Sequence, residues 1–558
     1  MKKILATFMA LILVFGLGAC KPPMEGDDID PNKTQIYVAI GDNGVGTEFL
    51  YDLKAAYEAY NTEVEIVPVQ KDAELNNGTV YMKNATEDIV MMGGSNDFSQ
   101  IDDYLMDLTD LVKIKAYDED GEYVGKGNGV KTLEDKMKAY ENNYKMFNVG
   151  TPEQPKFKSL PWFSSIYGLW YDIDLFEDEN LFNLQGYKGI DGIAGTEDDF
   201  YGPDGLPDTY DDGLPATWED MKLLLSEMKT KNFKPFTFSG MHGWMRSFWL
   251  DTVFLNYEGL NDYALNYSFN GTDSDFGKIN SSNGYLLKQQ EGRKAMLLVA
   301  EEIAKKSLYS NDSLKSTQTH LMAQADFLDS VTTDAPSAFL IDGNWWEYEA
   351  RDTFDRMAKI NKKFARGTRR FGYFPIPRFI GTKGLKDQIN TKQYARDISS
   401  YLLLVNKNTK VKDEVEDFLL FSRSETSLRN FTKTTNLFCA YDYDMSNDLG
   451  SLTPLARSVY DLIRSDNVEM VYSGSTDILC VSDGLTAREV QLSLRGRNNT
   501  FFEGWEINTA VTINGREENF SDPIRDMAYD TTGELNAESW FAGLQKMCTK
   551  EKWETYFR

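Results

Sequence analysis

The densest group of ionisable side chains lies between Gly189 and Gly213, where the sequence reads GIDGIAGTEDDFYGPDGLPDTYDDG. These 25 residues hold seven Asp and one Glu. Extended by one residue, the stretch divides into two halves of 13 residues in which Gly and Asp recur at matching positions. Repulsion among so many carboxylates is unfavourable without a counter-charge. Calcium takes about six to eight oxygen ligands, which short loops rich in Asp and Gly supply, so we expect calcium here.

The recurring carboxylates of this stretch are the candidate ligands: Asp191, Asp198, Asp199, Asp204, Asp211 and Asp212. Their spacing departs from the EF-hand pattern, so that pattern assigns no order of ligands. We interpret the ion as structural, because it would staple a long loop, and not as a catalyst. The alternative is a solvated acidic insertion that holds no metal.

Other side-chain chemistries are poorly represented. The chain has two histidines, His242 and His320, which leaves little room for a His-based triad or a multi-His metal site. The four cysteines are widely spaced: Cys20, Cys439, Cys480 and Cys548. This spacing is not typical of a zinc site or a disulfide framework; it allows one disulfide, but we expect buried thiols. The formal net charge of −28 disfavours a nucleic-acid partner, because phosphates need basic patches.

The N-terminus predicts an exported protein. Lys2 and Lys3 precede an apolar run that is too short for an ordinary membrane-spanning helix. The following tetrapeptide Leu-Gly-Ala-Cys resembles a bacterial lipobox, in which the cysteine becomes the lipidated first residue of the mature protein. We therefore predict a signal peptide over residues 1–19, and a lipidated Cys20 with a flexible polar tether over residues 20–34. The alternative is a plain signal peptide with a chance cysteine.

Patterns of strands and helices alternate along the rest of the chain, which predicts an α/β fold. The expected strands cover residues 35–40, 64–70, 88–92, 338–341, 371–377 and 400–405. The expected helices cover 47–60, with Thr47 as the cap, 217–229, with Thr217 as the cap, and 412–422, and residues 452–558 are expected to be mostly helical. Pro68 indicates that the second strand lies at a sheet edge or ends early. The length and the 41% hydrophobic content favour two or three packed units.

Seven sequence blocks occur in a characteristic order. They are the strand and Gly-rich turn at 35–46, 88–90 with 105–111, 160–162 with 167–176, 215–220, 338–345, 375–377 and 405–421. Together, over roughly residues 35–442, they resemble the extracellular solute-binding proteins of ABC importers, in the maltose-binding-like branch that captures sugars. The last hundred or so residues match none of these blocks.

The resemblance implies an α/β fold of the type II periplasmic-binding-protein kind, with two lobes, a hinge and an interlobe cleft for the ligand. By this resemblance, lobe one holds residues 35–160 and 396–442. Lobe two holds residues 161–395 and 443–558, including the acidic insertion 189–213.

Sugar recognition needs aromatic rings against C–H faces and polar groups for the hydroxyls. The resemblance places ligand-binding candidates at the cleft: Trp162, Phe163, Tyr167, Trp244, Trp249, Asn344, Trp345, Trp346 and Glu347, with Asn43, Asn96 and Asp97 as further polar candidates. The alternative for each aromatic residue is that it packs in a core. The alternative for Asn43, Asn96 and Asp97 is that they only shape turns.

Neighbouring residues refine this set. Trp345 and Trp346 are adjacent, so in an extended segment only one of them would line the cleft. We expect Trp170 and Trp218 in the core, and both histidines to be structural or on the surface.

The resemblance implies a non-enzymatic substrate-binding lipoprotein, held by its lipid on the outer side of a bacterial cell membrane. It would capture a carbohydrate, expected to be an oligosaccharide, and deliver it to the permease subunits of an ABC importer. We expect a monomer. Two alternatives stay open: a surface glycan-binding lipoprotein that serves no importer, and a glycoside hydrolase with paired carboxylates. Peptide and other polyol ligands also stay open.

Overall fold

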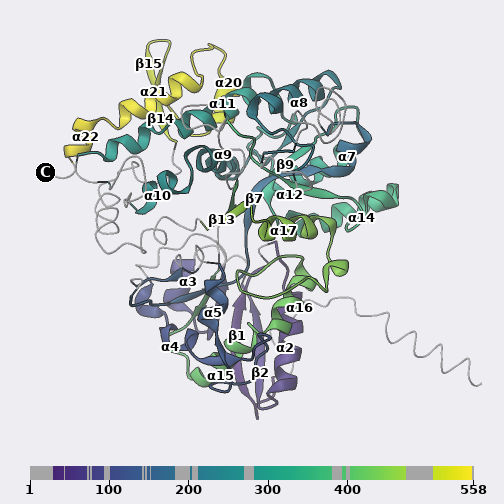
Figure 1. Ribbon diagram of the computed structural model, residues 1–558, viewed down its shortest axis with the longest axis vertical. Helices are drawn as coiled ribbons and strands as arrows, with labels where there is room; N and C mark the ends of the chain where they lie inside the picture. The colour runs from purple at the N-terminus through teal and green to yellow at the C-terminus, as the bar shows by residue number, and fades with distance from the viewer. Residues whose placement is uncertain are drawn as a thin grey trace, which may run out of the picture.

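The computed structural model shows two lobes, one above the other in Figure 1, each built around a β-sheet with helices packed on it. The structure describes residues 29–42, 44–71, 75, 78–92, 101–140, 144, 147–150, 153–182, 201–203, 211–268, 279, 282–379, 393–397, 402–472 and 507–555.

Lobe one contains a five-stranded sheet in the order β2-β1-β3-β12-β6. Its strands are β1 (Thr34–Ile40), β2 (Val64–Gln70), β3 (Ile89–Met92), β6 (Ser159–Pro161) and β12 (Leu402–Val405). The first three strands are parallel, whereas β12 is antiparallel to both of its neighbours. β2 lies at the sheet edge, as Pro68 predicts, yet it pairs with β1 along its full length.

The other elements of lobe one surround this sheet: α2 (Glu48–Tyr60), α3 (Gly78–Asn84), α4 (Thr109–Val112), α5 (Leu133–Lys138), α15 (Lys412–Phe421), α16 (Glu425–Thr435) and the hairpin of β4 (Lys115–Tyr117) and β5 (Lys131–Thr132). α2 packs against α16 and buries Phe49, Leu50 and Tyr57. Its first residue follows Thr47, as predicted, but the Thr47 side chain makes no capping hydrogen bond.

Lobe two contains a six-stranded sheet in the order β13-β11-β7-β9-β8, with β10 also paired to β7. Its strands are β7 (Ile166–Asp172), β8 (Phe236–Thr237), β9 (Phe339–Gly343), β10 (Phe371–Phe374), β11 (Gln393–Asp397) and β13 (Val468–Tyr472). Its helices include α7 (Ile173–Asp178), α8 (Trp218–Thr230), α9 (Gly243–Glu258), α10 (Leu260–Ser268), α11 (Glu291–Lys305), α12 (His320–Ser330), α13 (Trp346–Glu349), α14 (Arg351–Ile360) and α17 (Pro454–Arg464).

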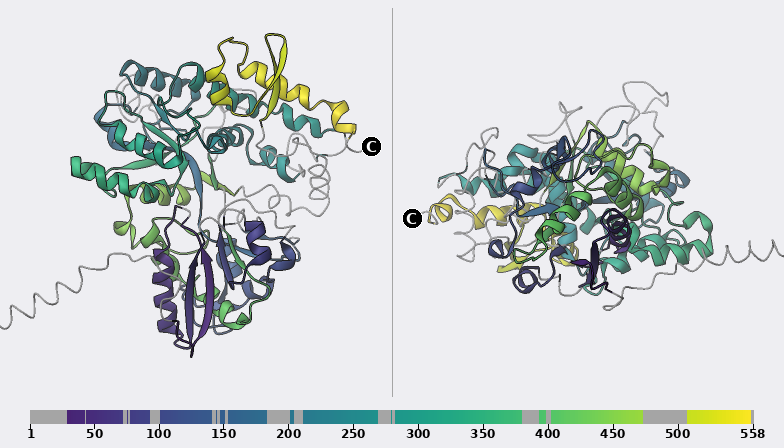
Figure 2. Two further views of the ribbon diagram at one scale, coloured as in Figure 1. Left: turned by 180° about the vertical axis from the view of Figure 1, so that it is seen from behind. Right: turned by 90° about the horizontal axis from the view of Figure 1, so that it is seen from below.

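The C-terminal segment is less helical than the sequence predicts. It contributes β13 to the sheet of lobe two and adds β14 (Thr509–Ile513), β15 (Arg516–Phe520), α20 (Pro523–Tyr529), α21 (Ala537–Met547) and α22 (Lys550–Thr555). β14 and β15 form a hairpin, and α20 and α21 pack against α11. Figure 2 shows this yellow segment on the side of lobe two that is remote from lobe one. Arg246 on α9 forms a buried ion pair with Asp522, which joins the segment to the lobe.

Three crossing segments connect the lobes, after β6, after β11 and after α16. They bond to one another: the Ser164 N–H donates to the Phe438 carbonyl (2.6 Å), and the Ser165 N–H donates to Asp397 Oδ1 (2.9 Å). The second crossing joins β11, which ends at Asp397, to β12, which begins at Leu402. Several connections that cross together between two lobes are typical of hinged two-lobe proteins.

Candidate binding site at the lobe junction

Lobe one contributes the turn that follows β1. The Asp42 carbonyl accepts from the Val45 N–H (2.8 Å), and Asp42 Oδ1 accepts from the Gly46 N–H (2.9 Å). Gly44 and Gly46 have φ angles of +76° and +74°, which favour glycine. The turn therefore needs its glycines. It lies at the carboxyl end of a parallel strand, where open α/β sheets bind their ligands.

Behind the turn lies a small cavity of about 20 Å³, with Met91, Met92, Trp162 and Phe163 in its lining. Trp162 is almost fully buried, and its ring centroid lies 5.2 Å from that of Phe49 on α2. Trp162 thus fills space between the crossing segment and α2, and only its margin borders this cavity.

Lobe two contributes an aromatic cluster, which we define as Tyr167, Trp244, Phe248 and Trp345. The Tyr167 ring centroid lies 6.0, 5.9 and 5.9 Å from those of Trp244, Phe248 and Trp345. Trp244 and Phe248 are four residues apart on α9, so they share a helix face. Trp244 is 44% exposed, whereas Trp345 is mostly buried and Tyr167 fully so. The cluster therefore offers one open indole on a rigid aromatic base.

The two lobes touch at this point. The Tyr348 hydroxyl of α13 donates a hydrogen bond to Glu48 of α2 (2.7 Å). A methyl group placed on Gly44 would lie 2.4 Å from Glu349 Oε1 and 2.7 Å from Trp345 Cδ1. The turn after β1 thus faces the start of α13 directly, and the aromatic cluster lies beside the contact.

Two buried carboxyl groups lie next to the cluster. Gln324 Nε2 donates to Asp342 Oδ2 (3.0 Å) and to Glu349 Oε2 (2.7 Å). Burial raises the pKa of Asp342 to about 7. Burial, reinforced by the charge of Asp342, raises the pKa of Glu349 to about 8. His320 Nε2 lies 3.7 Å from Glu349 Oε1, and burial together with the charge of nearby His242 lowers the pKa of His320. Near neutral pH the pair therefore retains protons that ordinary carboxyl groups would have lost.

Polar atoms without partners mark the same place. The hydroxyl of Tyr167 and Oδ1 of Asn344 are buried and have no hydrogen-bond partner among the described residues. Burial raises the pKa of Tyr167 well above its usual value, so it stays a neutral donor. Because buried polar groups are nearly always paired, these atoms are candidates to bond a ligand.

The structure brings some predicted residues together at the junction: Tyr167, Trp244 and Trp345 from lobe two, and Trp162 and Phe163 behind the turn of lobe one. Asn344 lies beside them, where its Nδ2 donates to the Ser164 carbonyl (3.3 Å) of a crossing segment. Asn43, Asn96 and Asp97 lie outside the described residues.

Three other predicted residues belong elsewhere. Trp249 is buried against Phe236 of β8, on a different face of α9 from Trp244. Trp346 packs against the rings of Phe327, Phe354 and Phe371 in the core of lobe two. Glu347 is buried and accepts from Thr453 Oγ1 (2.7 Å), which ties α13 to α17. Residues 345 and 346 begin a helix rather than an extended segment, and of the pair Trp345 faces the junction.

The core expectations for Trp170 and Trp218 are confirmed, since both side chains are buried. Sequence reasoning missed several junction residues: Phe248, Gln324, Asp342, Glu349 and the two histidines, whose rings lie 5.4 Å apart. Phe248 could have been found from its spacing of four residues from Trp244. The carboxyl pair had no local signal, because Asp342 lies within β9 and Glu349 lies in the helix after it.

The proposed metal ligands are only partly described. Asp211 and Asp212 lie within the described residues, and Asp211 is fully buried close to Gly202. Asp191, Asp198, Asp199 and Asp204 lie outside them. Within the described ranges, no group of three or more His, Cys, Asp or Glu side chains could hold a metal ion. The part of the chain that the structure covers also contains no helix with the length and apolarity needed to cross a membrane.

Solved structures share the fold. The chain is 15% identical to a chitin oligosaccharide binding protein (TM-score 0.52), over 94% of this chain and 100% of that one. It is 14% identical to the BlMnBP1 binding protein of an ABC transporter from Bifidobacterium animalis subsp. lactis (TM-score 0.51), over 93% and 95%. It is 12% identical to a probable secreted solute-binding lipoprotein from Streptomyces coelicolor (TM-score 0.52), over 93% and 99%. A search of curated proteins found no match.

A family model described as "Bacterial extracellular solute-binding protein" matches residues 43–426, which is more than half of the chain. The match begins in the turn after β1 and ends in α16, so it includes the aromatic cluster and the first two of the three crossing segments. Proteins of this family act outside the cytoplasm. With its two-lobe fold and its match over these elements, the chain belongs to the bacterial extracellular solute-binding proteins.

Proposed function

We propose that this protein captures a carbohydrate, most suitably an oligosaccharide, at the lobe junction. It then delivers the carbohydrate to the permease of an ABC importer. Trp244 carries the proposal, because it is a large exposed indole at the place where the lobes meet, supported by Tyr167, Phe248 and Trp345. An exposed aromatic face next to polar groups suits a sugar ring, which has both C–H faces and hydroxyls.

The polar surroundings support the same ligand class. Buried donors and acceptors left without partners cost about 1–3 kcal/mol each, so a ligand that pairs them gains specificity. Tyr167 offers a hydroxyl and Asn344 a carbonyl oxygen. Protonated Asp342 and Glu349 add groups that both donate and accept near neutral pH. Sugar hydroxyls also donate and accept, so they match such a set.

Relatives of the same fold add support. One of them is a chitin oligosaccharide binding protein, and another is a binding protein in complex with mannobiose. The predicted signal peptide, the lipobox-like tetrapeptide and the lipidated Cys20 would hold this protein on the outer side of the membrane, where an importer receives its ligand. Ligand binding would favour the closed arrangement of the lobes, and the permease would recognise that arrangement.

The test is isothermal titration of the purified protein with a panel of oligosaccharides, followed by recovery of the sugar. We expect one glycan class to bind and to be recovered intact. Trp244→Ala should weaken that binding tenfold or more. The control Tyr529→Ala, at an exposed aromatic residue on α20, should bind as the wild type does.

Any of three results would contradict the proposal. Binding that is equally strong in Trp244→Ala would remove the aromatic cluster from the site. Hydrolysis of the bound glycan would point to an enzyme. If the glycan binds intact but deletion of the importer permease leaves its uptake unchanged, the protein is a surface glycan-binding lipoprotein instead.

A further inference from the structure

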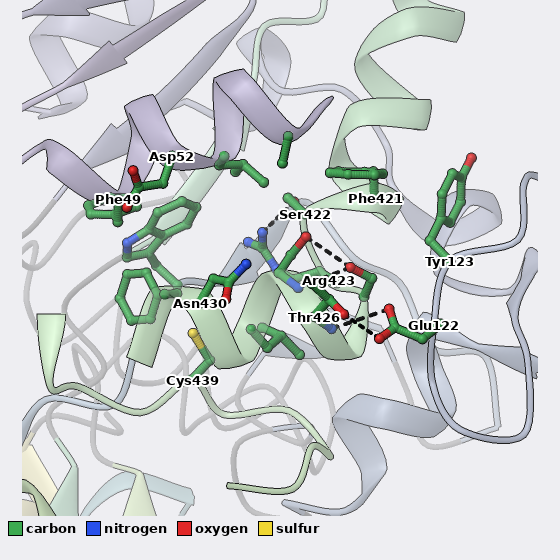
Figure 3. A pocket seen from close by; sticks show the side chains of 17 residues that line it. Phe49, Asp52, Glu122, Tyr123, Phe421, Ser422, Arg423, Thr426, Asn430 and Cys439 are labelled. Carbon is green, nitrogen blue, oxygen red and sulfur yellow. Dashed lines mark hydrogen bonds between the residues drawn. The ribbon is translucent and has the colours of Figure 1, made fainter. Parts of the chain in front are cut away.

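A second, larger cavity lies within lobe one, on the other side of Trp162 from the lobe junction. Its volume is about 290 Å³, and it opens between α2, α16 and the loop that carries Tyr123. Figure 3 shows the side chains that line it, with Phe49 and Asp52 on α2 and Thr426 and Asn430 on α16. This volume lies at the lower end of the range for small-molecule sites.

Arg423 is the one cation in the lining of this cavity. It is only 2% exposed, and it lies among the lining side chains in Figure 3. Its Nη1 donates to Ser422 Oγ (2.6 Å) and its Nη2 to the Pro161 carbonyl (3.4 Å). Its Nε is buried and has no hydrogen-bond partner among the described residues. No carboxylate in that part of the chain lies within ion-pair distance of it.

Three other buried arginines show the usual arrangement. Arg246, Arg369 and Arg396 each pair with a carboxylate, on Asp522, Asp172 and Asp251 respectively. A buried charge without a counter-ion is unfavourable, so proteins pair such charges. Among the described residues, the groups around the Arg423 guanidinium are neutral: Ser422 Oγ, the Pro161 carbonyl, the Tyr441 hydroxyl, and the faces of Trp162 and Tyr441 at 5.0 and 5.2 Å.

We propose that this cavity is a second ligand site, which binds a small aromatic carboxylate with its carboxylate on Arg423. A carboxylate supplies the missing counter-charge and an acceptor for the free Nε–H. The walls that would enclose the rest of the molecule are apolar rings and an aliphatic side chain: Phe49, Leu53, Tyr123, Trp162, Phe421 and Phe431. Flat rings pack well between such walls.

The carboxylates at the rim are already engaged. Glu122 accepts from the Thr426 hydroxyl and N–H, and Asp52 accepts from the Thr434 hydroxyl (3.0 Å). Asp52 is also exposed, so water screens its charge. The interior of the cavity therefore remains selective for an anion, and the rim excludes large polyanions.

The probe is benzoate, titrated into the purified full-length protein and followed by ligand-observed NMR, with uncharged benzamide and inorganic sulfate as comparisons. We expect benzoate to bind at millimolar concentration or below, and both comparisons at least tenfold more weakly. Arg423→Gln should weaken the affinity for benzoate at least tenfold. Because Arg423 is buried, its substitution also disturbs the packing around it. A second variant therefore tests the cavity without altering the arginine.

Ala56→Phe places a ring at the exposed rim of the cavity and should block benzoate, whereas Ala55→Phe, on the neighbouring exposed position of α2 outside the lining, should not. Trp244→Ala should bind benzoate normally, which separates this site from the junction. No binding of benzoate, or binding that survives both Arg423→Gln and Ala56→Phe, would overturn the proposal. If benzamide binds as strongly as benzoate, the ligand does not need a charge. If sulfate binds as strongly as benzoate, the ligand does not need an aromatic ring.

Discussion

At the scale of single residues, the carboxyl pair at the junction determines how stability responds to pH. Folding raises the pKa of Asp342 to about 7 and that of Glu349 to about 8, from ordinary values of 3.8 and 4.5. Between about pH 4 and pH 8 the native state therefore binds more protons than the unfolded chain. The contribution of this pair to the free energy of unfolding then falls as pH rises through this window, by up to about 1.4 kcal/mol per pH unit for each extra proton.

We predict that Glu349→Gln flattens this dependence, because the amide keeps the neutral form at every pH. Chemical unfolding at pH 5, 6, 7 and 8 measures the slope. Asp352→Asn, at an exposed position on the neighbouring α14, is the matched control and should keep the wild-type slope. A Glu349→Gln slope as steep as that of the wild type would show that the pair does not titrate in this range.

The aromatic residues show what a sequence can indicate about a site. Tyr167, Trp244 and Trp345 are cleft candidates by the family resemblance, and the structure brings their rings together. Trp249 and Trp346 are candidates on the same ground, yet each packs into a core. The difference depends on which face of α9 and of α13 meets the sheet, and that depends on tertiary packing.

At the scale of elements, α8 illustrates a local signal that is sufficient. Thr217 Oγ1 accepts from the Asp220 N–H (3.2 Å), and Asp220 Oδ2 accepts from the Thr217 N–H (2.9 Å), which is a capping box. We predict that Thr217→Ala lowers the free energy of unfolding by about 1 kcal/mol. Thr47→Ala is the control, since Thr47 precedes α2 without a capping bond and should change little. Chemical unfolding of both variants measures these changes. Equal losses of unfolding free energy in the two variants would contradict the prediction.

The acidic insertion is the element for which the sequence predicts a bound ion. We propose that residues 189–213 bind calcium and that the ion stabilises lobe two. A chelator should lower the melting temperature, and calcium should restore it. At a hundredfold excess over its dissociation constant, a ligand of the native state adds about 2.7 kcal/mol.

Magnesium and a double variant serve as controls for the calcium experiment. Magnesium demands nearly ideal octahedral geometry, so it should restore less of the melting temperature than calcium does. Asp198→Asn with Asp199→Asn should remove the response to calcium. A melting temperature that chelator leaves unchanged would identify a solvated acidic insertion.

Elements at the C-terminus were the hardest to predict. The periodicity of residues 452–558 indicates helices, and α17, α20, α21 and α22 occur there. β13, however, pairs with β11, which lies far away in the sequence. The hairpin of β14 and β15 carries a run of exposed charged residues on its second strand, which hides the alternation expected of a strand. β13 and the β14–β15 hairpin therefore depend on their pairing partners rather than on their own composition.

At the scale of the whole molecule, function depends on how the lobes meet. Gly44 lies at this contact with a φ of +76°, and a Cβ there would collide with Glu349 and Trp345 of lobe two. We predict that Gly44→Ala shifts the molecule toward the open arrangement. The radius of gyration in small-angle scattering should then increase with ligand present, and glycan affinity should fall about tenfold, which corresponds to about 1.4 kcal/mol.

Gly127→Ala isolates the effect of the collision. Gly127 lies in the β4–β5 hairpin loop of lobe one with a φ of +80°, and a Cβ there would meet nothing within 4 Å. Both variants place an alanine in the left-handed backbone region, which destabilises the native state by about 1–2 kcal/mol. Both should therefore unfold at similarly reduced denaturant concentrations. Only Gly44→Ala should also change scattering and affinity. If the two variants scatter and bind alike, the closed arrangement does not need the close approach of the β1 turn to α13, and closure must depend on the crossing segments instead.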